Sequence, residues 1–414
     1  MLRILREIDL WLLGVALVTV VLGVTMVYSA AYHSESLYVR TAWSKQAVVA
    51  VLATGVCLAV PFLPNRILYG LTYPLYGLVM LMLAAVMAWG HGEDAARWLD
   101  LGVVRFQPSE FAKLATVVAL ARYLADSTSD ELNQVRGFGI AVAIVAVPMA
   151  MVVQQPDLGT AMALGAPLFP MVFWAGTRRI FLFCVLSPLA SVLFSFEPLW
   201  KVVTPFVFAA FVITSAVLVQ YLLSQVWVTV AVAGCNLLAG LVTVYLWDHF
   251  LLPYQQDRIL IFLNPEVDRL GAGWNIIQSK IAIGSGGLTG KGFLEGTQTK
   301  YEFLPASHTD FIFSVIGEEL GFIGTIAVLA LFLFLVVRGL RIAAAARNRF
   351  HSLIAVGLAS MLAFHAFVNI GMTIGVMPVT GIPLPFLSYG GTALLANMVG
   401  IGLLLLIHLR RHEY

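Results

Sequence analysis

The stretch LWLLGVALVTVVLGVTMVYSAA, residues 10–31, decides the fold of this chain. It carries no charge and reaches the ~20 apolar residues that a helix needs to cross a lipid bilayer. Its small residues Ser29, Ala30 and Ala31 resemble the end of a secretory signal, but the run is longer than the apolar region of a signal peptide. We therefore expect a signal-anchor helix that is retained.

The composition extends this expectation to the whole chain. Of its 414 residues, 60% are hydrophobic and 11% are charged, whereas about a quarter of a soluble domain is charged. A helix satisfies its own backbone hydrogen bonds in lipid, so we expect an all-α, polytopic integral membrane protein. The net charge of +2 does not favour nucleic-acid binding. Three cysteines lie in apolar runs without metal-ligand spacing and are expected to be buried hydrophobes (Cys57, Cys184 and Cys235).

Apolar runs of sufficient length recur about twelve times along the chain. We predict spans at about 10–31, 45–63, 67–89, 108–125, 138–154, 158–176, 180–196, 203–223, 226–247, 311–337, 351–375 and 391–409.

The basic residues predict the orientation of these spans. With about twelve spans, four basic clusters fall on one side, which predicts cytoplasmic N- and C-termini. These clusters are Arg3 with Arg6, Arg178 with Arg179, the segment 338–349, and Arg410 with Arg411. The loops 90–107 and 251–310 then lie outside the cytoplasmic membrane.

The second of these loops is a polar segment in an otherwise apolar chain. It contains the glycine-rich stretch GSGGLTGKG at 284–292, which lacks the spacing of a P-loop. Residues 278–283 have the pattern of a short amphipathic helix. A catalytic acid or base is expected in or next to this loop, but spacing does not choose among four carboxylates, Asp257, Glu266, Asp268 and Asp310.

Several ionisable residues occur where spans are predicted, and each has two readings. Glu110 and Lys113 share a helix face, either as a buried pair or as the wall of a polar cavity. Asp157 follows Gln155-Pro156 and is either the acid at the start of a helix or part of the same wall. Arg97, beside Trp98, either binds a lipid phosphate or anchors the interface.

Other polar residues favour a packing role. We expect Glu318 and Glu319 to be structural, and His365 and Asn369 to join helices. Three prolines in GMTIGVMPVTGIPLPFLSYGGT, residues 371–392, forbid a continuous helix, so this segment must be buried in protein or line a cavity. We expect Gln107-Pro108 and Gln155-Pro156 each to place a proline at the first position of a helix.

Four blocks together resemble the SEDS family (shape, elongation, division and sporulation), and the resemblance covers most of the chain. They are RWLDLGVVRFQPSEFAKLA, QQPDLGTA, LNPEVDRLGAGWNIIQSKIAIGSGGLTGKG and the 371–392 segment. The resemblance implies one membrane domain, residues 1–414, with a core of ten spans. Residues 180–250 then hold about two inserted or variable helices, and 251–310 form the large extracytoplasmic loop.

The resemblance implies a peptidoglycan glycosyltransferase of the elongation branch, acting in cell-shape maintenance in the cytoplasmic (inner) membrane. It would polymerise lipid II, a disaccharide-pentapeptide on undecaprenyl pyrophosphate, with inversion. The essential acid of the family aligns with Asp268, the expected general base. The substrate-binding candidates are Arg97, Glu110, Lys113, Asp157, Arg269, Lys280 and Ser388. A divalent cation, Mg²⁺ or Mn²⁺, is an expected cofactor, although no motif demands one.

The implied partners are a class B penicillin-binding protein, which is a transpeptidase, and the elongation machinery. Two other functions stay open: a lipid II flippase, because transporters also have broken helices and intramembrane charges, or a scaffold that activates the transpeptidase. A flippase has no need of an essential acid on the outer side.

Overall fold

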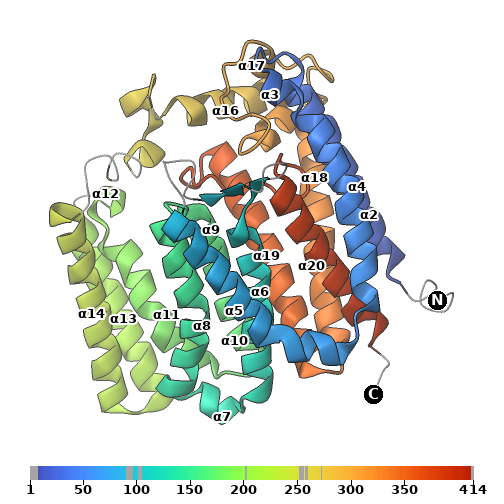
Figure 1. The fold of residues 1–414 in the computed structure, drawn as a ribbon. Coiled ribbons are helices and arrows are strands. Elements are labelled where there is room, and N and C mark those ends of the chain that lie inside the picture. Colours follow the sequence, from blue (N-terminus) through green and yellow to red (C-terminus); the bar gives the residue numbers. More distant parts are fainter. Residues whose placement is uncertain are drawn as a thin grey trace. The chain divides into compact units, whose positions relative to one another are not determined.

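The computed structural model describes residues 8–89, 97–100, 105–200, 203–250, 256, 260–271 and 273–411. Arg3, Arg6, Asp257 and residues 90–96, named above, lie outside this range. The all-α prediction is confirmed (Figure 1). The one β-ladder among the described residues joins β1 (Leu99–Asp100) to β2 (Arg105–Phe106), with Leu99 opposite Phe106.

The chain forms two compact units, unit 1 (residues 1–175 and 275–414) and unit 2 (residues 176–274). The helices of unit 1 are α2 (Leu10–Tyr32), α3 (Leu37–Arg40), α4 (Ala42–Ala59), η1 (Val60–Phe62), α5 (Asn65–Trp89), α6 (Pro108–Asp126), α7 (Ser129–Leu132), α8 (Val135–Gln154), α9 (Leu158–Gly165), α10 (Leu168–Trp174), α16 (Trp274–Ser285, from residue 275), α17 (Thr297–Lys300), α18 (Ile312–Ala345), α19 (Arg349–Ile374) and α20 (Gly391–Leu409). Those of unit 2 are α11 (Arg179–Ser195), α12 (Glu197–Trp200), α13 (Thr204–Leu223), α14 (Val226–His249) and η4 (Pro265–Asp268).

Each of the twelve predicted spans coincides with a helix or a helix pair. Within the described part of the chain, nine helical stretches are long and apolar enough to cross a membrane. The other three predicted spans correspond to α6, which carries four charged residues, to the pair α9 and α10, and to the shorter α11. Pro167, just before α10, separates α9 from α10.

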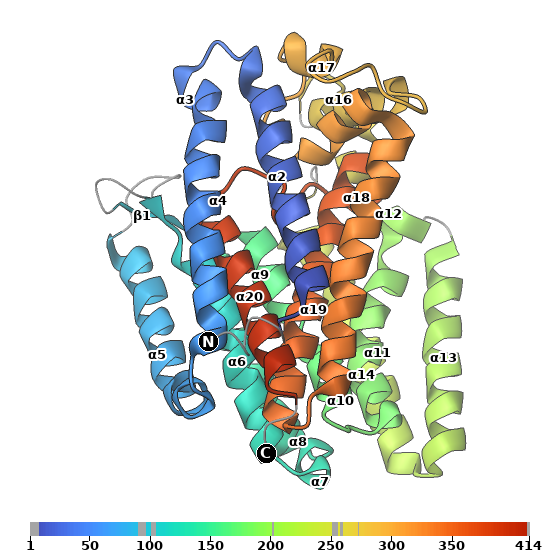
Figure 2. The same cartoon turned by 90° about the vertical axis from the view of Figure 1, so that its right-hand side faces the viewer.

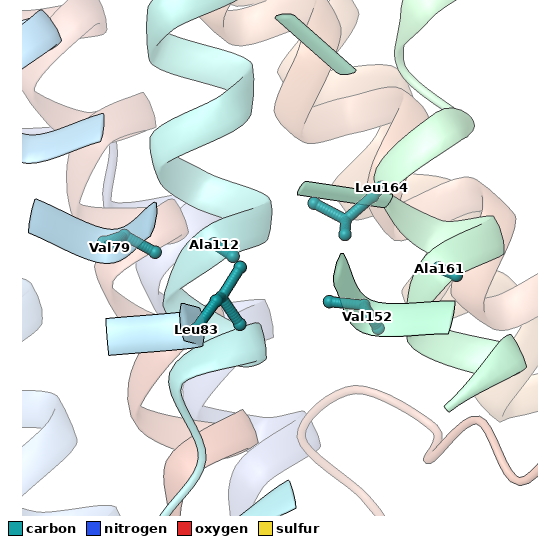
Figure 3. Close-up of a cluster of buried hydrophobic side chains, with 6 residues drawn as sticks. All are labelled: Val79, Leu83, Ala112, Val152, Ala161 and Leu164. Carbon is teal, nitrogen blue, oxygen red and sulfur yellow. The ribbon is translucent and has the colours of Figure 1, made fainter. Parts of the chain in front are cut away.

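The helices of unit 1 pack through an apolar core. Figure 3 shows one cluster, in which side chains from α5, α6, α8 and α9 meet. Its buried members are Val79, Leu83, Ala112, Val152, Ala161 and Leu164. Leu83 and Val152 are fully enclosed, so this cluster fixes α5 against α8 and positions the segments that follow both helices.

Two irregular segments interrupt unit 1. The chain leaves α19 at Gly375 (φ 77°) and stays non-helical until α20 begins at Gly391, which confirms the predicted break. Gly321 (φ 64°) interrupts α18, and a Cβ there would lie 2.3 Å from the backbone nitrogen of Gly290. Glycine is therefore required where the 284–292 loop contacts α18.

Residues 275–310 of the polar segment lie at one end of unit 1 (Figures 1 and 2). α16 and α17 lie at the same end as α3 in both views (Figures 1 and 2). Ser279 on α16 donates from its hydroxyl to the Thr373 carbonyl at 2.6 Å, at the end of α19. The helix predicted at 278–283 is thus confirmed as the central part of α16.

The first and last helices meet at the opposite end. Arg338 Nε lies 2.5 Å from Asp9 Oδ2, and His408 Nδ1 lies 4.0 Å from the same oxygen. Burial raises the pKa of Asp9, but the hydrogen bonds from Arg338 and the Leu12 amide outweigh it and lower the pKa overall. The start of α2 and the end of α20 therefore lie at the same end of unit 1, as an even number of spans requires.

Unit 2 has a polar centre of its own. Asn236 on α14 is fully buried, and its Nδ2 donates to Ser215 Oγ on α13 at 2.9 Å. Its Oδ1 accepts from Ser187 Oγ on α11 at 3.0 Å. Three helices were predicted here, and one asparagine joins all three. That they are an insertion relative to the family stays a prediction.

Candidate functional site

A buried charged cluster joins α6 to α19. Lys113 Nζ lies 2.9 Å from Glu110 Oε2 and 3.0 Å from His365 Nε2, and all three residues are almost completely buried. Because an ammonium only donates, His365 Nε2 must accept, so Nδ1 carries the proton toward the Met361 carbonyl at 2.8 Å. This arrangement supports the packing reading of the Glu110–Lys113 pair.

The helix-joining role expected of His365 is confirmed, but its partner was not foreseen. His365 contacts Lys113, which is 252 residues away in sequence. Asn369 instead donates to the carbonyls of Asp310 (2.9 Å) and Ile382 (2.8 Å), and so holds two irregular segments together.

Arg97 and Asp157 lie in one polar corner of unit 1. Arg97 Nε donates to the Gln155 carbonyl at 3.1 Å, and Nη2 donates to the Pro156 carbonyl. Gln107, just before α6, donates from Nε2 to Asp157 Oδ2 at 3.2 Å. The loop after α5 is thereby fastened to the start of α9.

Asp157 is the N-cap of α9, as the helix-start reading predicted. Its Oδ1 accepts from the Thr160 amide at 3.1 Å, and its Oδ2 accepts from the Thr160 hydroxyl at 2.9 Å. The prediction that Pro156 opens this helix is wrong, because Asp157 is the cap and Leu158 the first helical residue. Pro108 does occupy the first turn of α6.

Asp310 belongs to the same corner. Burial, together with the negative charge of Asp157, raises the pKa of its carboxyl to about 6, while the Arg97 guanidinium opposes the shift. Asp310 was one of four carboxylates that spacing did not separate. The structure thus places the Asp310 carboxyl beside Asp157, which the sequence did not predict.

Lys280 and Ser388 have defined surroundings in unit 1. A Cβ at Gly375 would lie 2.5 Å from Lys280 Nζ, so this amine lies on the backbone of the broken segment. The buried Ser388 hydroxyl donates to the Thr309 carbonyl at 2.7 Å and accepts from the Leu384 amide at 2.8 Å. This hydroxyl connects the 382–390 segment to the residues before α18.

The Glu318 side chain holds the glycine-rich loop and the Glu319 side chain holds α2, in agreement with their expected structural role. Glu318 is fully buried, and its Oε1 accepts from Lys291 Nζ (2.7 Å) and from the Thr297 amide (2.9 Å). Both oxygens of Glu319 accept from the Ser29 hydroxyl on α2, at 2.6 and 2.8 Å. The loop therefore has a fixed position on α18.

The carboxylate selected by resemblance lies in unit 2. Asp268 is exposed at the end of η4, and its Oδ1 accepts from the Gly271 amide at 3.0 Å. Arg269 Nε lies 2.7 Å from Glu266 Oε2 in a solvent-exposed pair. The turn thus orients the Asp268 carboxylate, while Arg269 is engaged beside it.

No metal cluster is present among the described residues, which contain no group of three or more His, Cys, Asp or Glu side chains suited to hold an ion. A Mg²⁺ site in an enzyme of phosphate esters commonly uses one or two carboxylates together with substrate phosphates. Burial and the negative charge of Asp157 both raise the pKa of Asp310, so Asp157 and Asp310 are two neighbouring carboxyls that would hold such a cation.

Comparisons with known proteins give a consistent result over nearly the whole chain. The family model described as "Cell cycle protein" (FtsW, RodA and SpoVE) matches residues 9–207 and 201–413. The chain is 38% identical to "Peptidoglycan glycosyltransferase RodA" of Treponema pallidum, covering 99% of each chain. It is 40% identical to "Peptidoglycan glycosyltransferase MrdB" of Escherichia coli K12, covering 84% of this chain and 80% of the relative.

A solved structure has the same fold. It comes from the work titled "Structural coordination of polymerization and crosslinking by a peptidoglycan synthase complex" and matches with a TM-score of 0.73 and 31% identity. The match covers 98% of this chain and 99% of that one. The part of this chain that matches the solved structure therefore includes residues 180–250.

Proposed function

We propose, because the chain belongs to the cell cycle protein family of FtsW, RodA and SpoVE, that it is a peptidoglycan glycosyltransferase that polymerises lipid II during cell elongation. The observation that carries this proposal is the similarity to two proteins named as such enzymes, at 38% and 40% identity. For RodA of Treponema pallidum it extends over 99% of both chains.

The proposed reaction is an inverting displacement at a sugar. The hydroxyl oxygen of the acceptor sugar forms a bond to the anomeric carbon of the donor, and the bond from that carbon to the pyrophosphate breaks. Asp268 takes the proton of the attacking hydroxyl. Its exposed carboxylate supports this role, since the Gly271 amide donates to Oδ1 and orients it.

The leaving pyrophosphate needs positive charge. Among the proposed substrate residues, Arg97 suits this role best, because it lies in a polar corner at the end of two spans and a guanidinium binds phosphate bidentately. Lys113 is engaged by Glu110 and His365, which favours a structural role. A divalent cation held by Asp157 and Asp310 would supply further charge to the pyrophosphate.

We propose that the enzyme lies in the cytoplasmic membrane with cytoplasmic termini and an extracytoplasmic catalytic loop. The basic clusters support this orientation. We further propose a class B penicillin-binding protein as partner. This proposal is supported by the similar solved chain, which belongs to a peptidoglycan synthase complex by its title.

The test is polymerisation of lipid II by the purified protein in nanodiscs with its transpeptidase partner, read as glycan strands on a gel. Asp268→Asn is expected to lower the rate by at least 100-fold, because general-base catalysis contributes roughly 10²–10⁴-fold. Glu266→Gln, a change of the neighbouring exposed acid, serves as the matched control.

Full activity of Asp268→Asn would overturn the role of this residue. Absence of any polymer from the wild-type protein with its partner would overturn the proposed function and favour a flippase or a scaffold. Loss of activity only in Glu266→Gln would move the base to that residue.

A further inference from the structure

An apolar groove lies between α5 and α8 on the lipid-facing side of unit 1. Its volume is about 550 Å³, within the ~300–1,000 Å³ that is typical of small-molecule sites. Three of the lining residues are alanines, and their short side chains create the open space. Six of the seven lining residues are exposed. The lining residues are Ala84, Met87, Ala88, Val147, Ala150, Met151 and Gln154.

The groove ends next to the polar corner that contains Arg97. α5 ends at Trp89 and α8 at Gln154, so the groove lies at the ends of both spans. Gln155 connects the two features: its Nε2 donates to the Leu83 carbonyl at 3.2 Å, beside the groove, and its own carbonyl accepts from Arg97. The apolar groove thus ends close to the Arg97 guanidinium, at the ends of two spans.

We propose that this groove binds the polyprenyl chain of one lipid substrate, with the phosphate of that lipid at Arg97. The inference rests on the proposed function and deepens it, because it assigns a binding site to the polyprenyl chain of the lipid as well as to its phosphate. In this arrangement the polyprenyl chain lies between α5 and α8.

The shape and chemistry of the groove favour a single unsaturated chain. The groove lies between only two helices, so we expect it to take one chain and a two-chain phospholipid to leave its second chain outside. Met87 and Met151 have flexible thioether side chains that adapt to an irregular apolar ligand. Arg97 supplies the complementary charge for a phosphate.

The first experiment uses the full-length protein in nanodiscs and a polyprenyl phosphate that carries a photoreactive diazirine in its chain. We expect cross-linked peptides to map to residues 84–88 and 147–154. Excess unlabelled polyprenyl phosphate should suppress the labelling, whereas excess phosphatidylglycerol should not. Equal suppression by both lipids would overturn the proposal, because the groove would then be a general lipid contact.

The second experiment fills the groove. Ala84→Phe and Ala150→Phe replace exposed alanines that line it, and Ala146→Phe makes the same change at an exposed position on α8 outside it. We expect labelling to fall about tenfold in the first two variants, since each displaced methylene loses its apolar contact. Ala146→Phe should label like the wild type. Unchanged labelling in both groove variants would overturn the proposal.

The third experiment tests whether Arg97 recognises the phosphate of the lipid. Arg97→Gln should weaken binding of polyprenyl phosphate about tenfold and leave binding of the uncharged polyprenol unchanged. Equal loss for both lipids would show that Arg97 does not recognise the phosphate.

These measurements require no turnover, so they separate the two proposals. Wild-type labelling in the groove without polymer formation would leave the chain site standing and remove the proposed function. Polymer formation with labelling elsewhere would do the reverse. The wild-type labelling map and the lipid competition decide the inference even if a substituted variant fails to fold.

Discussion

Lys113 shows how a single charge is maintained inside the membrane. Its ammonium lies between the Glu110 carboxylate and the His365 ring. Glu110 is one turn away on the same helix, and the His365 ring is held by its hydrogen bond to the Met361 carbonyl. Such a cluster stabilises only while it is complete, because each buried charge relies on its partner.

We expect Lys113→Met to destabilise the protein by about 3–5 kcal/mol, because it leaves the Glu110 carboxylate buried without its cation. The measurement is the unfolding temperature of the purified protein in detergent. The double variant Glu110→Gln with Lys113→Met removes both charges and should recover much of the loss. A single variant as stable as the wild type would show that Glu110 is already neutral.

Asp310 gives a pH dependence of stability. Burial raises its pKa from 3.8 to about 6, so the folded state binds the proton more tightly than the unfolded chain does. Its contribution is complete below about pH 4 and is lost as the pH rises to about 6, with a total of about 3 kcal/mol.

Asp310→Asn removes this titration. We expect the variant to gain stability relative to the wild type between pH 4 and pH 6, with a constant difference above about pH 6.5. Unfolding temperatures measured from pH 4 to pH 8 will show it. Parallel curves for the two proteins would contradict the raised pKa of Asp310.

Sequence reasoning succeeded where a residue acts on its own helix. Asp157 caps α9 and Glu110 pairs with Lys113, and both relations lie within three residues. It did not find the contact of Lys113 with His365, nor the place of Asp310 beside Asp157, because these depend on which helices pack together. Burial and distant partners carry no local sequence pattern.

At the scale of elements, the N-terminal part of α18 holds the glycine-rich loop, residues 284–292. The Lys291 amide donates to the Glu318 carbonyl at 2.9 Å, and the Phe322 amide donates to the Gly287 carbonyl at 2.9 Å, on either side of the break at Gly321. The Glu318 side chain adds its own bonds to the loop. A glycine-rich segment with so many backbone degrees of freedom is thereby held in one conformation.

We expect Glu318→Gln to loosen residues 291–298. Hydrogen bonds to a charged group contribute about 1.5–3 kcal/mol, so local opening should become roughly tenfold more frequent or greater. Hydrogen exchange measured by mass spectrometry will report it.

Glu295→Gln is the matched control for this change, since Glu295 is an exposed acid of the same loop. Its exchange should equal that of the wild type. Identical exchange in Glu318→Gln and Glu295→Gln would show that the backbone bonds alone hold the loop.

The elements themselves were largely predictable, because the length and apolarity of a span are local properties. The break between α19 and α20 was also predicted, from three prolines. The interruption of α18 at Gly321 was missed, since a lone glycine in an apolar run is ordinary in a membrane helix. Only the contact with the 284–292 loop gives it meaning.

At the scale of the molecule, the division into two units was not predicted as such. The resemblance predicted inserted or variable helices at residues 180–250, and unit 2 contains these residues. Its helices α11, α13 and α14 are joined by Asn236, whose role is invisible in sequence because its two serine partners lie on other helices.

The orientation of the whole chain can be tested by cysteine labelling. Asp9, Arg338 and His408 converge at one end of unit 1, and α17 lies at the other (Figure 2). After replacement of the three native cysteines, we expect Lys300→Cys on α17 to react with an impermeant maleimide in right-side-out membrane vesicles. Ala345→Cys, at the end of α18, should react only after permeabilisation, because the basic 338–349 segment is expected inside. The cysteine-free parent is the control. A reversed pattern would place α17 in the cytoplasm, where no extracytoplasmic sugar acceptor could reach the loop. That result would refute both the proposed orientation and the proposed polymerase.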